Sequence, residues 1–208
     1  NTRLILLNSP HNPTGKVFNH QELSQIAKLA VEKDLLVITD EVYEHLVFDG
    51  QSHIPISTLP DMSDRTLTIS SAAKTFGFTG WKIGWAHGPS ELLAAVRIAK
   101  QFLTYVNGAP FQHAIAEALK LDENYYMNLA LDMANKRDIL CEGLEKAGFE
   151  VFRPSGTYYA TVDIRPLGDE DGIEFCWDLP NRCGVVAVPN EVFYDNKTIG
   201  KPLVRFAY

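Results

Sequence analysis

Short apolar runs alternate with amphipathic stretches along the first part of the chain. Apolar residues at helical spacing, preceded by Asn19 and Glu22 as a capping box, predict a helix that starts near residue 19. The same spacing predicts a helix over residues 90–104. The apolar runs between helical stretches predict strands at 3–8, 35–39, 66–70 and 83–87. Because strands and helices alternate, the pattern favours an α/β fold with a parallel sheet.

A long helical stretch over about 122–147 leads to Gly148, and the pattern changes there. After Gly148 come the strand-like segments "FEVFR", "TYYATVDI", "VVAVP" and "LVRFA", with one helix between them. This order predicts a smaller α+β domain. We therefore expect part of a large domain over 1–121, a connecting helix over 122–148 and a small domain over 149–208. Since apolar strands stand at both ends of the sequence, we expect the chain to be an internal segment of a longer protein.

Composition narrows the class of protein. The net charge of −7 argues against a nucleic-acid partner, which would favour a basic face. No apolar stretch has the length of a membrane span, so we expect no membrane partner. Three cysteines without a CxxC pair do not predict a disulfide framework, and a reducing cytoplasm is the expected compartment.

Polar side chains follow three of the predicted strands. Asn12 comes after the first strand, Asp40 and Tyr43 follow the second, and Ser71 and Lys74 follow the third. The carboxyl ends of parallel strands meet at one edge of a sheet, where ligands collect. If these strands share a sheet, the five side chains converge there and form a candidate site.

Each candidate also has a plainer interpretation. Asp40 can be a helix N-cap, and Lys74 can be an ordinary surface lysine. The neighbours of Lys74 are small or apolar, however, and a partly desolvated lysine is suited to act as a nucleophile or to form a Schiff base. His45 near Asp40 and Glu41 offers too few ligands for a coordination set, so we expect no metal site.

Five motifs occur in an order and at a spacing that resemble one enzyme family. They are "NSPHNPTG", "ITDEVY", "SSAAKTF", "TGWKIGW" and "VRFAY". Together they resemble the fold type I pyridoxal-phosphate aminotransferases of class I and II, over essentially the whole chain. The resemblance implies that the chain is the second half of a longer transferase. It also implies pyridoxal 5′-phosphate as cofactor, amino and keto acids as substrates, and a homodimer.

The resemblance assigns roles around the cofactor ring. Lys74 matches the lysine that binds the cofactor aldehyde and later moves a proton at the substrate. Asp40 matches the carboxylate that keeps the pyridine nitrogen protonated. Asn12 and Tyr43 match the pair that hydrogen-bonds the phenolic oxygen of the ring. Under this interpretation Lys74, Asp40 and Tyr43 are catalytic, and all four bind cofactor.

The resemblance also assigns the two anionic groups. Ser71 and Lys82 match the ligands of the cofactor phosphate, and many relatives have arginine at the second position. Arg205, together with Asn12, matches the group that binds the substrate α-carboxylate. Tyr158 and Tyr159 stand near this carboxylate site in relatives, although core aromatics of an alternating strand explain them equally well.

Within the family, the motifs look most like actinobacterial N-succinyldiaminopimelate aminotransferases of lysine biosynthesis, with glutamate as the expected amino donor. The kynurenine and glutamine–phenylpyruvate transaminases, some of them cysteine-conjugate β-lyases, are the alternative. A non-enzyme also stays open, because some transcription regulators carry an aminotransferase-like domain that senses ligands. Upstream sequence separates these classes: a basic helix-turn-helix indicates a regulator. We expect the 208 residues alone to fold poorly and to show no turnover.

Overall fold

The computed structural model describes residues 1–208 as two compact units. The first contains residues 1–10, 17–47 and 52–129, and the second contains residues 11–16, 48–51 and 130–208. The strands are β1 (Leu4–Asn8), β2 (Leu36–Asp40), β3 (Thr66–Ser71), β4 (Gly84–His87), β5 (Glu150–Phe152), β6 (Tyr159–Asp163), β7 (Val188–Pro189) and β8 (Leu203–Ala207). The helices are α1 (His20–Glu32), α2 (Ala72–Thr75), α3 (Ser90–Leu103), α4 (Ala109–Ala118), α5 (Glu123–Lys146), α6 (Gly172–Cys183) and α7 (Lys197–Gly200).

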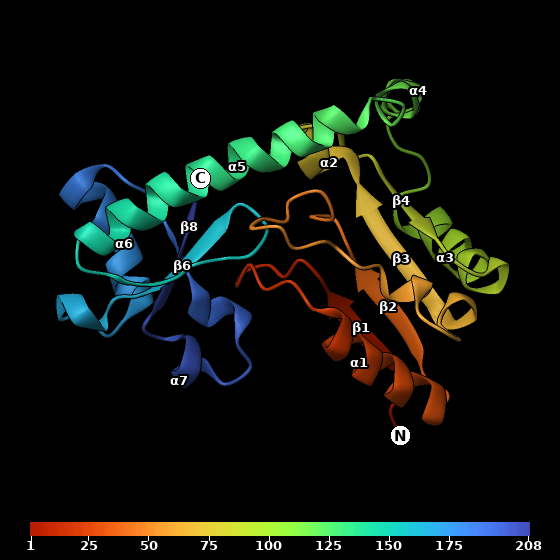
Figure 1. Ribbon diagram of the computed structural model, residues 1–208, viewed down its shortest axis with the longest axis horizontal. Helices are drawn as coiled ribbons and strands as arrows, with labels where there is room; N and C mark the ends of the chain where they lie inside the picture. The colour runs from red at the N-terminus through yellow and green to blue at the C-terminus, as the bar shows by residue number, and fades with distance from the viewer. The chain divides into compact units, whose positions relative to one another are not determined.

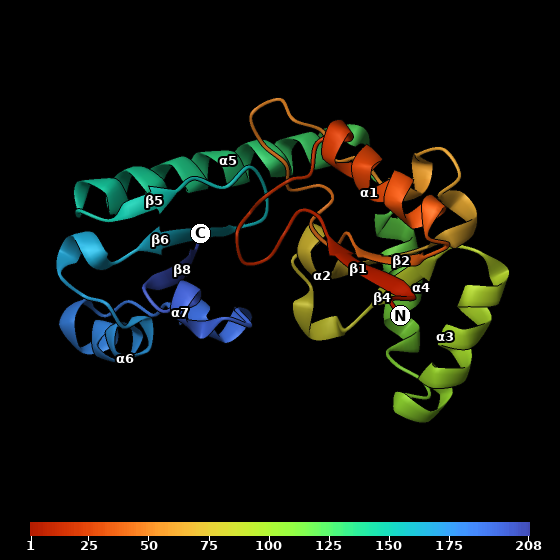
Figure 2. The ribbon, with the colours of Figure 1, turned by 90° about the horizontal axis from the view of Figure 1, so that it is seen from below.

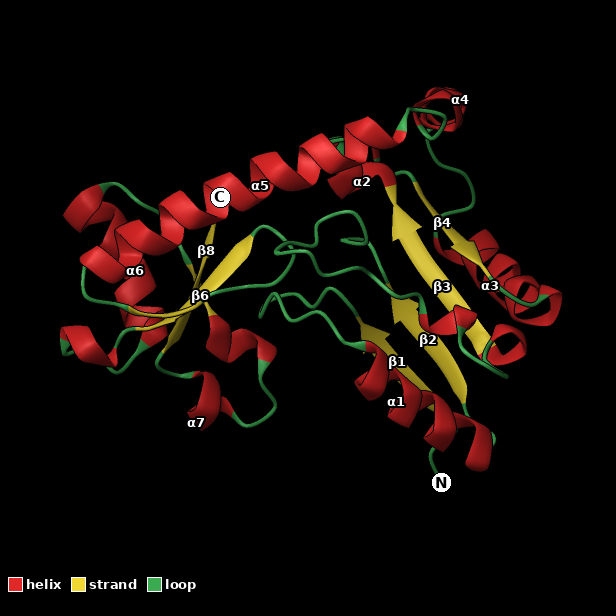
Figure 3. Cartoon of the chain, viewed as in Figure 1, coloured by secondary structure: helices red, strands yellow, loops and turns green.

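The first unit is built on a four-stranded sheet in the order β1-β2-β3-β4. The first three strands are parallel, as predicted, and their arrows point the same way in Figure 3. β4 runs antiparallel to β3, which the strand–helix alternation did not predict. The short connection between β3 and β4 explains the antiparallel direction. Residues 72–83 contain only short helical turns, and the amide of Ala72 donates to the carbonyl of Ile83, which returns the chain directly alongside β3.

Helix α1 covers β1 and β2, as Figure 1 and Figure 2 show. Its start is the predicted capping box, in which Asn19 and Glu22 each accept the backbone N–H of the other. Buried residues of the helix meet buried residues of the strands in one apolar cluster that includes Leu23, Ala27, Ala30, Leu7, Val37 and Ile56. This packing fixes the sheet edge from which the site residues extend.

Two helices follow β4. α3 agrees with the predicted helix over 90–104, whereas the sequence analysis missed α4. Pro110 in the first turn of α4, just after Gly108, is a start signal that could have indicated this helix. Phe102 in the last turn of α3 is 84% exposed, and Tyr105 and Val106, which follow that helix, are also exposed.

The second unit contains a sheet in the order β5-β6-β8-β7, in which all pairs are antiparallel. Its core joins side chains of β6, β8, α5 and α6, among them Val162, Val204, Leu144 and Phe175. The loop over residues 11–16 also belongs to this unit. Gly15 O accepts the amides of Ser155 and Gly156, and a Cβ at position 15 would stand 2.2 Å from the Pro154 side chain. Gly15, with a φ of +68°, therefore lets the loop lie against residues 154–156.

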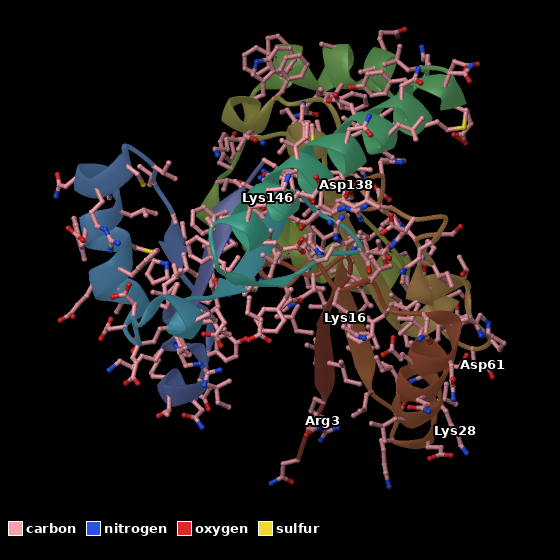
Figure 4. All side chains as sticks on the ribbon, turned by 60° about the vertical axis from the view of Figure 1, so that its left-hand side comes forward. Arg3, Lys16, Lys28, Asp61, Asp138 and Lys146 are labelled. Carbon is pink, nitrogen blue, oxygen red and sulfur yellow. The ribbon has the colours of Figure 1, made fainter.

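Arg137 on α5 ties three segments of the second unit together. Its guanidinium, 3% exposed, binds both carboxylate oxygens of Asp49 at 2.6 and 2.8 Å and donates to Pro154 O. Asp138, which Figure 4 labels on α5, accepts from Arg137 and Arg153. None of the helices combines the length and the apolar character that crossing a bilayer requires.

Loss of the Arg137 side chain is expected to lower the free energy of unfolding by about 2 kcal/mol, because the half-exposed Asp49 carboxylate and the buried Pro154 carbonyl lose a charged donor. The hydrogen bond from Arg137 lowers the pKa of Asp49. The stabilisation is thus complete above the pKa of an unfolded aspartate, about 3.9, and is lost as the pH falls through the lowered folded value. Urea unfolding of Arg137→Ala and Asp49→Asn at several pH values measures this. An unchanged midpoint for Arg137→Ala at neutral pH would contradict it.

Candidate active site

The carboxyl ends of β1, β2 and β3 form one edge of the first sheet. Asn8 pairs in register with Asp40, and Asp40 pairs with Ile69. The Asp40 carbonyl accepts the Asn8 side-chain amide at 2.9 Å and the Ser9 amide at 3.1 Å. The next residue, Glu41, donates its amide to Ile69 O at 2.9 Å. Both neighbouring strands therefore hold the backbone at the end of β2.

One carboxylate oxygen of Asp40 accepts a hydrogen bond from the chain, and the other is open to a ligand. Its Oδ1 accepts the Val42 amide at 3.1 Å, so the capping interpretation holds for the turn over residues 41–44. Its second oxygen accepts no hydrogen bond from the chain. A partly buried carboxylate with one open oxygen can accept a hydrogen bond from a ligand.

Tyr43 and Lys74 lie close together in the first unit. Tyr43 is 2% exposed, and Lys74 Nζ is 5.9 Å from the centroid of its ring. Lys74 itself is partly buried on α2. Ser71 is the N-cap of this helix and accepts the Ala73 amide at 3.3 Å, which leaves its hydroxyl proton available to a further acceptor. A solvated surface lysine, the plainer interpretation of Lys74, does not describe this position.

Lys82 approaches the same strand end from the opposite direction. Ser71 pairs with Gly84 across the antiparallel β3–β4 ladder, two residues after Lys82. The backbone of Lys82 is left-handed, with a φ of +56°, and the Asn107 side chain donates to its carbonyl at 2.6 Å. Its side chain is exposed. The exposed ammonium group can therefore take an anionic partner beside Ser71.

Arg205 and Asn12 meet in the second unit. Arg205 donates to Asn12 Oδ1 at 2.6 Å. Its guanidinium lies over the rings of Tyr159 and Phe193, with its Cζ atom 4.0 and 4.9 Å from their centroids. No carboxylate pairs with it, so most of its donors stay available at the edge of a plane held by two aromatic faces.

Of the two aromatic rings against Arg205, the sequence analysis considered one and missed the other. Tyr159 is one of the two tyrosines considered for the carboxylate site, and the ring of Tyr158 lies 4.5 Å from its ring, centroid to centroid, at a tilt of 57°. The sequence analysis missed Phe193, which belongs to a short turn before α7 and follows no recognisable motif. Only the pairing of β7 with β8, which brings Val188 opposite Arg205, places this turn near the arginine.

A polar cluster lies behind the turn that carries Asp40 and Tyr43. Ligand atoms of Glu41, Glu44 and His53 lie within 4.8 Å of one another. His53 and Glu41 are hydrogen-bonded at 2.8 Å, and Glu44 accepts from Ser70 at 2.6 Å. The sequence analysis considered His45 here and missed His53, which is far from the motif along the chain. Glu41 and Glu44 thus each accept a hydrogen bond from the chain.

Comparison with known proteins identifies the family. The family model described as aminotransferase class I and II matches residues 1–207. The chain belongs to this family. The family predicted from the five motifs is therefore confirmed.

Curated proteins similar to this chain are also aminotransferases. A probable N-succinyldiaminopimelate aminotransferase of Mycobacterium tuberculosis is 53% identical over 100% of this chain and 54% of its own length. Mouse kynurenine–oxoglutarate transaminase 3 is 40% identical over 100% of this chain and 50% of its own. This class I/II aminotransferase chain thus spans about half the length of the curated relatives it matches.

Solved structures confirm the predicted fold type I architecture. N-succinyldiaminopimelate aminotransferase from Mycobacterium tuberculosis superposes with a TM-score of 0.96 at 52% identity, over 100% of this chain and 54% of that one. The methionine aminotransferase YbdL of Escherichia coli superposes with a TM-score of 0.92 at 34% identity, over 100% and 55%.

Proposed function

We propose that this aminotransferase chain is part of a pyridoxal-phosphate-dependent enzyme that moves an amino group from glutamate to a keto acid. We call the full-length protein that contains these 208 residues the parent. The observation that carries the proposal is the placement of Lys74 and Asp40 at the carboxyl ends of neighbouring parallel strands, with an amine and an open carboxylate oxygen.

The donor set of the chain suits this cofactor. Pyridoxal phosphate, when bound, supplies an aldehyde that reacts with amines and a ring that withdraws electrons. Lys74 offers an amine. The open oxygen of Asp40 can accept the proton-bearing ring nitrogen. Ser71 and Lys82 offer a hydroxyl and an ammonium group for the phosphate.

Each of these residues would have its own role in a transamination. Asp40 would hold a proton on the ring nitrogen, because its negative charge favours the protonated form. Tyr43 and Asn12 would donate to the ring oxygen. The amine of Lys74 would act as the general base for the proton of the substrate Cα. Arg205 binds the α-carboxylate, for which its planar fork is suited.

Relatives support a specific acceptor. The 53% identity to a probable N-succinyldiaminopimelate aminotransferase favours N-succinyl-2-amino-6-ketopimelate, and with it a role in lysine biosynthesis. The 40% identity to a kynurenine–oxoglutarate transaminase keeps kynurenine and aromatic keto acids as the second candidate, with cysteine-conjugate β-lyase chemistry as a side activity. Retention of the carboxylate by Arg205 favours transamination over decarboxylation.

We also propose that the parent is a cytoplasmic homodimer. The exposed Phe102, Tyr105 and Val106 form an apolar segment at the end of α3 and just after it that suits burial against a second copy. Cys141, Cys176 and Cys183 are all free thiols, as a reducing compartment favours.

A comparison of acceptors tests the substrate. The parent is supplied with glutamate and, in separate reactions, with N-succinyl-2-amino-6-ketopimelate, phenylpyruvate and the keto acid of methionine, and 2-oxoglutarate is measured. We expect the succinylated acceptor to give the highest kcat/KM. A parent that prefers phenylpyruvate by tenfold or more, about 1.4 kcal/mol of transition-state binding, would instead assign the aromatic branch.

A further inference from the structure

The turn over residues 41–44 connects Asp40 and Tyr43, and a buried hydrogen bond between Glu41 and His53 lies behind it. Glu41 is 2% exposed and the side chain of His53 is 9% exposed. Their Oε2 and Nε2 atoms are 2.8 Å apart. Charged groups are buried at a cost and need partners, so a buried carboxylate inside a functional motif calls for an explanation.

The contacts of Glu41 involve the residue before Asp40 and the turn after it. Thr39, the residue before Asp40, donates its hydroxyl to Glu41 Oε1 at 3.1 Å. Glu41 itself follows Asp40, and its carbonyl accepts the Glu44 amide at 2.8 Å, which closes the turn beneath Tyr43. Each carboxylate oxygen of Glu41 thus has one partner, and the side chain links the end of β2 to residue 53.

The hydrogen-bond partners of the His53 ring favour one tautomer. Its Nδ1 atom is buried and has no hydrogen-bond partner. A protonated ring would bury an N–H without an acceptor, so the neutral tautomer with hydrogen on Nε2 fits the site. His53 then donates to a charged Glu41, which is a charge-assisted hydrogen bond and a strong one.

We infer that Glu41 and His53 form a positioning pair that fixes the orientation of Asp40 and Tyr43 toward the cofactor. This inference rests on the proposed function. Glu44, bonded to Ser70, ties the far end of the same turn to β3. Without Glu41–His53 the turn keeps that tie and its backbone bonds, but it loses the side-chain contact adjacent to Asp40. The Val42 amide, which orients the Asp40 carboxylate, then moves with the turn.

The test measures cofactor binding by the parent. The apoprotein of each variant is titrated with pyridoxal phosphate, and the dissociation constant, the position of the visible absorbance band and the thermal midpoint are recorded. We expect Glu41→Ala to weaken binding by about tenfold or more and to shift the band. Glu41→Gln should have a much smaller effect, because its amide oxygen can still accept from His53. His53→Ala should resemble Glu41→Ala, and the double variant should add little, since the pair acts as a unit.

A matched control separates positioning from stability. Asp171 caps α6 in the second unit by accepting the Ile173 and Glu174 amides. Asp171→Ala removes this cap and is expected to lower the thermal midpoint while the dissociation constant and the band stay unchanged. If Glu41→Ala does not fold, Glu41→Asp keeps the charge but withdraws the carboxylate from His53, and the same criteria apply to it.

The outcomes are distinct. Glu41→Ala, or Glu41→Asp in its place, with unchanged cofactor affinity and band overturns the inference, even if its thermal midpoint falls. An unmodified parent that takes up no pyridoxal phosphate overturns the proposed function, and this inference with it.

Discussion

Replacement of Lys74 by alanine is expected to lower the turnover of the parent by about 10⁴-fold or more. In the proposed function the amine would supply both the covalent attachment of the cofactor and the general base at the substrate Cα, and each of these is a large catalytic effect. Lys74 is partly buried on α2, near the Tyr43 ring and directly after the Ser71 cap. Lys82, which stands near the same strand end, has an exposed side chain. The rate of 2-oxoglutarate formation from glutamate measures the effect.

Lys33→Ala is the matched control for this loss. Lys33 is an exposed lysine at the end of α1, far from any predicted ligand position in the sequence, and we expect full turnover. Far-ultraviolet circular dichroism of both variants checks that the fold is retained. Substantial activity in Lys74→Ala would remove Lys74 from the catalytic machinery and would return it to an ordinary structural lysine.

Replacement of Arg205 by lysine is expected to lower kcat/KM about 100-fold for both the donor and the acceptor. Lysine keeps the charge but loses the planar fork that binds a carboxylate through two parallel hydrogen bonds. It also loses the stacking on Tyr159 and Phe193 that holds the guanidinium plane. Because both substrates carry an α-carboxylate, the loss should affect both, and most of it should appear in KM.

Arg182→Lys serves as the control for this substitution. Arg182 is an exposed arginine on α6 within reach of Asp178 and Asp169, and surface ion pairs of this kind contribute little. We expect unchanged kinetics. An Arg205→Lys variant that affects only one of the two substrates would show that Arg205 contacts the variable side chain of that substrate and not the shared carboxylate.

Much of the first unit could be predicted because its signals are local. The capping box at Asn19 and Glu22, the apolar face of α1 and the apolar run before Asp40 depend only on neighbouring residues. The adjacent carboxyl ends of β2 and β3, from which Asp40 and Lys74 follow, were expected from one general rule, that parallel strands present their carboxyl ends at the same edge. The long helix α5 was also evident from its periodicity.

The remainder depends on contacts between distant residues. The reversal of β4 arises from a short connection whose strand-like ends look the same in either direction. The Glu41–His53 pair and the contact of Phe193 with Arg205 join residues with no shared motif, and periodicity carries no information about such pairs. The roles of Asn12, Tyr43, Ser71, Lys82 and Arg205 came from family resemblance and stay predictions.

The absorbance spectrum of the parent, before and after addition of glutamate, is the most direct test of whether Lys74 and Asp40 hold pyridoxal phosphate for transamination. We predict a yellow protein whose visible band decreases with glutamate and returns when a keto acid is added, and a Lys74→Ala variant without this cycle. A colourless protein that takes up no cofactor, or a band that glutamate does not change, would contradict the proposal.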